Sequence, residues 1–166
     1  MSNRVYRFII FALIVLLSIV AVQAVSLSRQ VREMERQAGE DIMRTINMLD
    51  DIQTFIAVQL DKEDVDFVLL QDLVGTGYTT ASRTGMPALA YYYERMQVEL
   101  LADDGSDEQA LAGTIKELNE HLGGLLALVL GKDAEVPRTA QHQFLWVTGQ
   151  DKEFSAQVTD YIRSRK

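Results

Sequence analysis

An uncharged apolar run near the amino terminus limits what this chain can fold into more than any other feature. It extends from Phe8 to Ser28 without a charged side chain. As one helix it would span roughly 30 Å, the thickness of a hydrocarbon core. We therefore expect residues 1–28 to form a short N-terminal tail and a transmembrane signal anchor.

The same run also fits a cleaved leader, with Arg4 and Arg7 as its basic region and a small-residue cleavage site after Ala24. A cleaved leader is normally followed by an extended segment. Here the chain instead continues with apolar side chains on one helical stripe: Val31, Met34, Ala38, Ile42, Leu49, Ile52, Ile56 and Leu60. No Pro or Gly separates Ala24 from Arg36, so we favour an uncleaved anchor and one helix from about residue 6 to residue 60.

The flanking charges bear on the orientation of this anchor. Arg4 and Arg7 precede the run, and Arg29, Arg32 and Arg36 follow it, so the positive-inside rule gives nearly a tie. A short N-terminal tail usually stays in the cytoplasm. We therefore predict a single-pass membrane protein whose C-terminal domain is extracytoplasmic.

The charge and composition of residues 29–166 exclude several classes of function. All 24 acidic residues and 14 of the 16 basic residues lie there, which gives a formal charge of 14 − 24 = −10. Such a surface repels phosphate backbones, so nucleic acid is not an expected partner. The chain has no cysteine, which excludes disulfides, thiolate metal sites and a Cys nucleophile.

The fold class follows from the pattern of apolar residues. Only two prolines occur, and no segment alternates apolar and polar residues with a period of two, so we predict an all-α fold. The membrane helix would continue into an antiparallel bundle of four or five helices, with residues 29–166 as one acidic domain. The acidic joint 61–66 would cap a helix over about 65–74. Further helices are expected over about 86–101, along a stripe from Leu111 to Val129, and over about 139–163. The turn 102–107 precedes the stripe helix, and Ser106 or Asp107 would cap it. In the stripe helix, Gly123 and Gly124 would permit the close approach of another backbone.

A glycine- and hydroxyl-rich segment, 75–85, is predicted to connect two helices. It lacks the spacing of a nucleotide-binding loop. The simple interpretation is a connector that ends near Pro87. The alternative is a small-anion pocket beside the N-terminus of the next helix, formed by Arg83, Thr80, Ser82 and Thr84.

The helix over 86–101 carries candidate partner-binding residues. Its predicted inner face consists of Leu89, Tyr92, Tyr93, Met96 and Leu100. Tyr91, Val98 and Leu101 point nearly the other way, so they are either packed against a neighbouring helix or exposed to a partner. Trp146 lies on the flank of the last helix, where it would serve as a lid or a contact.

Asp151 is the one acid placed inside an apolar stripe of the last predicted helix. The stripe consists of Ala140, Phe144, Val147, Phe154, Val158 and Tyr161. A carboxylate there must be paired, hydrated or protonated. The simple interpretation is a rim position or an ion pair, and the alternative is a functional buried acid.

No motif indicates catalysis. His121 and His142 fall on different predicted helices without metal-ligand spacing, and His121 follows Glu117 by one turn, as in a surface pair. Hydrolase and dinucleotide motifs are also missing. We therefore expect neither an enzyme nor a bound metal or cofactor.

In layout the chain is similar to the extracytoplasmic input bundles of bacterial chemoreceptors and sensor kinases, where a membrane helix also runs straight into the domain. No second span or output module follows Tyr161–Lys166, so signalling within this chain is not expected. The sequence predicts a non-enzymatic protein that binds a partner protein, a second copy or a membrane assembly. The first alternative is a ligand-sensing bundle that signals through a separate protein. The second, a secreted bundle, requires cleavage after Ala24.

Overall fold

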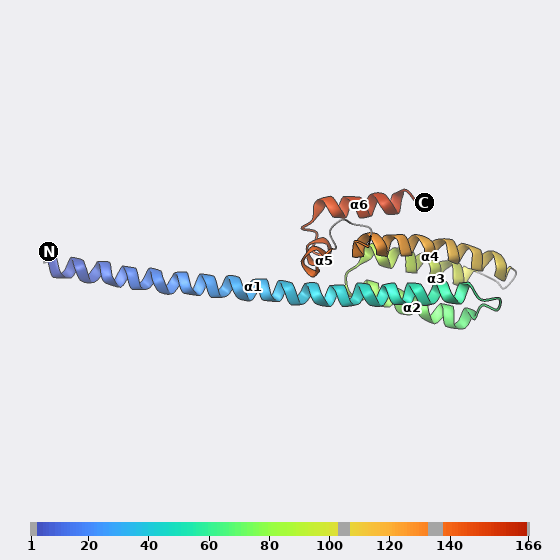
Figure 1. The fold of residues 1–166 in the computed structure, drawn as a ribbon, viewed down its shortest axis with the longest axis horizontal. Coiled ribbons are helices and arrows are strands. Elements are labelled where there is room, and N and C mark those ends of the chain that lie inside the picture. The colour runs from blue at the N-terminus through green and yellow to red at the C-terminus, as the bar shows by residue number, and fades with distance from the viewer. Residues whose placement is uncertain (1–2, 103–106, 133–137, 166) are drawn as a thin grey trace. The chain divides into compact units, whose positions relative to one another are not determined.

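A computed structural model describes residues 3–102, 107–132 and 138–165, with side chains from residue 7 onward. These residues form an all-α structure, as predicted (Figure 1). The helices are α1 (Asn3–Leu60), α2 (Phe67–Arg83), α3 (Pro87–Ala102), α4 (Glu108–Leu130), α5 (Ala140–Val147) and α6 (Lys152–Arg163). Contacts divide the chain into two units, Met1–Gln37 and Ala38–Lys166.

The first unit contains the apolar stretch of α1. The helix continues through Ala24 without a break, as the missing Pro and Gly predicted. Every side chain from Arg7 to Met34 is exposed, and an 18-residue window here has a mean hydropathy of 2.9. Among the described helices, α1 is the one long and apolar enough to cross a membrane, a test that a signal sequence also passes.

The second unit is a helical bundle. The later part of α1 packs with α2, α3 and α4, and consecutive helices run antiparallel (Figure 1). The predicted stripes of α1, α3 and α4 supply much of the core: Leu49, Ile52, Ile56, Leu60, Leu89, Tyr92, Tyr93, Met96, Ile115, Leu118, Leu122, Leu125 and Val129 are buried. The prediction of a bundle built on these stripes is confirmed.

Buried hydrogen bonds tie α1 to its neighbours within this bundle. The Tyr93 hydroxyl donates to the Leu49 carbonyl at 3.0 Å, and burial raises the pKa of Tyr93 well above its ordinary value. The side-chain amides of Asn119 and Gln53 each donate an N–H to the backbone carbonyl of the other residue, at 3.3 Å. Because an unpaired buried polar group costs free energy, these pairs favour one register of α1 against α3 and α4.

Two acids cap helices where the sequence predicted caps. Asp66 Oδ1 accepts a hydrogen bond from the Leu69 N–H at 3.0 Å, at the start of α2. Asp107 Oδ1 accepts one from the Ala110 N–H at 2.9 Å, at the start of α4. Ser106, the other candidate for the second cap, lies outside the described residues.

The predicted connector over 75–85 is wrong, because α2 continues to Arg83. Its buried side, which includes Gly77 and Ala81, packs against α3, and a Cβ on Gly77 would overlap the Tyr93 ring. Packing therefore offsets the low helix propensity of this segment. The helix ends where Gly85 adopts a φ of +70° and the next N–H, of Met86, donates to the Ala81 carbonyl at 3.0 Å.

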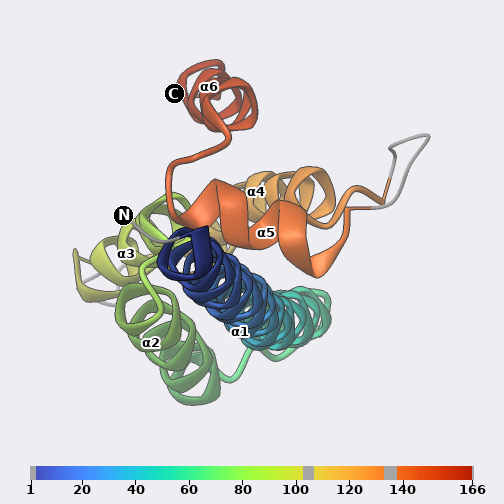
Figure 2. The ribbon, with the colours of Figure 1, turned by 90° about the vertical axis from the view of Figure 1, so that its left-hand side faces the viewer.

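The predicted last helix over 139–163 is also wrong, because it is divided into α5 and α6 (Figure 2). Gly149 has a φ of +71°, and the Gln150 N–H donates to the Leu145 carbonyl at 2.8 Å, which ends α5. Asp151 then caps α6, since its Oδ1 accepts from the Phe154 N–H at 3.0 Å. Asp151 is half-buried at a helix N-terminus, so it is not a buried acid inside an apolar stripe.

Candidate functional site

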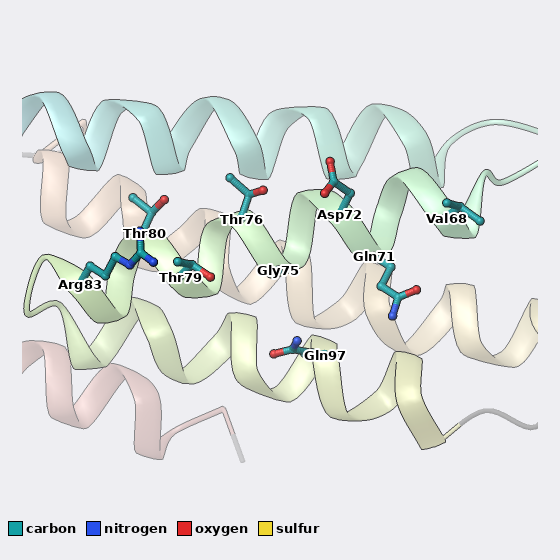
Figure 3. A pocket seen from close by; sticks show the side chains of 9 residues that line it. All are labelled: Val68, Gln71, Asp72, Gly75, Thr76, Thr79, Thr80, Arg83 and Gln97. Carbon is teal, nitrogen blue, oxygen red and sulfur yellow. The ribbon is translucent and has the colours of Figure 1, made fainter.

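The residues of the predicted anion pocket are only partly brought together. Thr80 and Arg83 line a shallow hollow of about 660 Å³ that runs along α2, with Gln97 contributed by α3 (Figure 3). Ser82 and Thr84 do not line it, and the Thr84 hydroxyl donates to the Thr80 carbonyl at 2.6 Å. The hollow does not involve the N-terminus of α3, and most of its polar side chains are exposed, so nothing in it concentrates positive charge on an anion.

The four predicted partner-binding residues separate into two places. Tyr91 and Trp146 line an apolar groove of about 440 Å³ between α3, α5 and α6. Tyr91 is half-buried with its ring edge-on to Tyr92, at 5.3 Å between centroids. Trp146 is only 8% exposed and packs against Phe154, so its predicted place on the flank of the helix is wrong.

Val98 and Leu101 belong to a set of exposed apolar side chains at one end of the bundle. At this end α1 and α3 finish and α2 and α4 begin (Figure 1). Phe55 and Val58 come from α1, and Val68 and Leu69 from α2. Their exposed fractions range from 42% to 80%. We call these six residues the apolar end.

A third hollow, of about 330 Å³, lies between α3, α4 and the end of α6. Its lining residues are Arg95, Thr114, Glu117, Leu118, His121, Ser164 and Arg165. The predicted surface pair of His121 with Glu117 is wrong: His121 is half-buried, with its ring edge-on to Tyr92 at 6.5 Å. The Tyr161 hydroxyl donates to the His121 carbonyl at 3.0 Å.

At the glycine pair of α4 the predicted close approach of another backbone is wrong, because side chains occupy the space beside both glycines. A Cβ on Gly124 would overlap the Tyr161 hydroxyl of α6. A Cβ on Gly123 would lie 3.0 Å from Gln53 Nε2 of α1. Both glycines therefore admit side chains from neighbouring helices, and Gly124 lets α6 close one side of the pocket.

No protein-family model, curated protein or solved structure matches this chain. Its similarity in layout to chemoreceptor and sensor-kinase input bundles therefore stays a prediction. Within the described residues, no three His, Asp or Glu side chains gather so that they could hold a metal ion. The expected lack of a metal, a cofactor and an enzymatic activity is not tested by this observation and also stays a prediction.

Proposed function

We propose that this chain is a membrane-anchored, non-enzymatic protein whose extracytoplasmic helical bundle binds a second protein at the membrane. The observation that carries the proposal is the apolar end. Its six large side chains stay exposed although the same bundle buries a full set of core residues. Exposed apolar side chains are normal when scattered singly, whereas a group rimmed by polar residues is typical of a docking surface.

The position of these residues supports one binding surface. Two of them come from each of α1, α2 and α3. Each pair lies within a few turns of the end of its helix that is found at this end of the bundle. Burying a side chain such as Phe or Val stabilises a complex by about 1.5–3 kcal/mol before ordering costs. Six such side chains are enough to anchor a standard interface.

The charges beside the apolar end indicate the chemistry of the partner. The joint between α1 and α2 contains Asp61, Glu63, Asp64 and Asp66, against the single Lys62. The complementary surface is therefore an apolar patch bordered by Lys or Arg. An anchor in the same membrane would raise the effective concentration of such a partner without any new contact.

Site-specific photo-crosslinking in native membranes tests this function. A photoreactive residue at Phe55, Val68 or Val98, one on each helix, should give the same discrete adduct. The matched control is Asp160, an exposed position on α6, which should give none. Val68→Asp should abolish the adduct formed from Val98 while far-UV circular dichroism stays unchanged.

The mass of the adduct identifies the occupant. An adduct with a different protein supports partner binding, whereas an adduct of twice the chain's own 18.7 kDa assigns the surface to self-association. No adduct from any of the three positions, or the same adduct from Asp160, would contradict a docking surface at the apolar end.

A ligand-sensing bundle that signals through a separate protein is the second candidate function. It is favoured by the pocket between α3, α4 and α6, because His121, one of its lining residues, has a buried ring nitrogen without a hydrogen-bond partner among the described groups. In this case a ligand should change the amount of partner captured through the apolar end.

A further inference from the structure

Two buried polar atoms on facing helices lack a hydrogen-bond partner among the described protein groups. One is the hydroxyl of Tyr92 on α3, a residue only 1% exposed. The other is Nδ1 of His121 on α4, and the two rings stand edge-on at 6.5 Å. Of these two residues, His121 lines the pocket and Tyr92 does not. Buried polar atoms are nearly always paired, so an unpaired ring nitrogen on a lining residue favours a polar ligand in this pocket.

Two guanidinium groups converge on the same place from different helices. Arg95 on α3 and Arg165, just beyond α6, both line the pocket, and neither forms an ion pair within the described part of the chain. Burial raises the pKa of Tyr92, while Arg165 and Arg95 both act to lower it. The two cations therefore act on the same buried ring, which agrees with their place in one pocket lining.

Aromatic rings help to hold these two cations in position. The Arg95 guanidinium lies 5.9 Å from the centroid of Tyr91, and that of Arg165 lies 5.1 Å from the centroid of Tyr161. The Tyr161 ring is itself held by its hydrogen bond to the His121 carbonyl. Cation–π contacts of this kind restrict the side chains before a ligand arrives, which lowers the entropic cost of binding.

The charge and size of the pocket define what it can take. Two guanidiniums face one carboxylate, that of Glu117, so the lining is net positive although the domain is strongly acidic. The volume of about 330 Å³ is that of a site for a small molecule. A carboxylate accepts paired hydrogen bonds from a guanidinium and a further one from an imidazole N–H. Glu117 disfavours a multiply charged phosphate and can accept a hydrogen bond from a hydroxyl or amine on the ligand.

We propose that this pocket binds a small carboxylate, held by the guanidinium groups of Arg95 and Arg165 and by the imidazole ring of His121, which line it together. This proposal rests on the second candidate function, in which the bundle senses a ligand. Binding of a carboxylate to the pocket can be measured separately from the capture of a partner protein.

Calorimetric titration of the full-length chain in detergent micelles tests the site. The probes are acetate, succinate, neutral acetamide and inorganic phosphate, at matched ionic strength. At least one carboxylate should bind saturably at millimolar concentration, whereas acetamide should not bind and phosphate should bind more weakly. Arg95→Gln and Arg165→Gln should each weaken carboxylate binding about tenfold, the loss expected for a charge-assisted hydrogen bond.

Two further variants separate a binding role from a structural one. His121→Phe keeps an aromatic ring at the pocket and removes only the ring nitrogens, so it should weaken binding several-fold without lowering the unfolding temperature. Arg163→Gln is the matched control, since Arg163 is an exposed residue of α6 that does not line the pocket, and binding should not change.

Three results would overturn the proposal: no saturable response to either carboxylate, binding that is equal in the Arg95→Gln and wild-type chains, or phosphate binding tighter than carboxylate binding. Carboxylate binding that leaves partner capture unchanged would support the site and contradict the ligand-sensing function. Loss of partner capture in Val68→Asp, with normal carboxylate binding, would support the apolar end and leave the pocket intact.

Discussion

The two stretches of α1 differ both in composition and in environment. From Phe8 to Ser28 the helix carries no charge and is apolar on all sides, and Leu17, for example, is 62% exposed. From Ala38 to Leu60 apolar residues lie on one stripe with charged residues between them, and Leu49 is fully buried. An amphipathic helix needs a neighbouring helix, whereas a helix that is apolar all round needs an apolar solvent. The second stretch has such neighbours in the bundle, and the first is long and apolar enough for a membrane span or a signal sequence.

The largest expected difference between the two stretches is in stability. Leu49→Ala removes a fully buried side chain and should lower the free energy of unfolding of the bundle by about 2–5 kcal/mol. Leu17→Ala removes the same atoms from an exposed position and should leave it unchanged. Denaturant unfolding of both variants in the same micelles measures this. Equal losses of unfolding free energy in the two variants would contradict the difference in burial between Leu49 and Leu17.

Membrane retention gives the reverse test. Leu17→Lys places a charge in the middle of the apolar run, where insertion costs about 2.5–3.5 kcal/mol, and should release a fraction of the chain from carbonate-washed membranes. Leu101→Lys is the matched control, since Leu101 is equally exposed at 66% but belongs to the bundle. Release of both variants, or of neither, would contradict an anchor in the first stretch.

A smaller effect is expected at Gly39, near the start of the second stretch. A Cβ there would overlap the Ala140 backbone of α5, so Gly39→Ala should destabilise the bundle by about 1–3 kcal/mol. Gly113 lies in α4, and a Cβ added to it would meet no other atom within 4 Å, so Gly113→Ala should stabilise the bundle by about 0.5–1 kcal/mol. Thermal unfolding should therefore show a lower unfolding temperature for Gly39→Ala and a higher one for Gly113→Ala. Stabilisation by Gly39→Ala would show that α5 does not pack on α1.

Helical periodicity predicted most of the fold because the buried stripes are regular. It placed Leu49, Tyr93 and Leu122 in the core, and local chemistry placed the caps at Asp66 and Asp107. The sequence prediction failed where packing overrides helix propensity. The glycines and threonines of α2 are typical of a loop, but packing against α3 stabilises them as a helix. The break between α5 and α6 did have a local signal: a glycine followed two residues later by Asp151 is a common way to end one helix and cap the next.

The candidate sites were less predictable than the fold. Helix geometry placed Val98 and Leu101 opposite the buried face of α3 but left open whether they pack against a neighbouring helix, and the structure shows them exposed. The pocket of Arg95, His121 and Arg165 did not follow from helix geometry, because its residues come from three helices far apart in the sequence. No spacing within one helix indicates that these helices meet. Trp146 was misplaced for the same reason, since its burial depends on Phe154 of the next helix.

Whether the apolar stretch of α1 anchors the protein is decided by the mass of the chain in membrane and soluble fractions. An anchored chain should be intact at 18.7 kDa and retained in membranes after a carbonate wash. A soluble fragment that begins at Val25 would show that the apolar stretch of α1 is a cleaved leader, and would contradict the membrane anchor on which the proposed function depends.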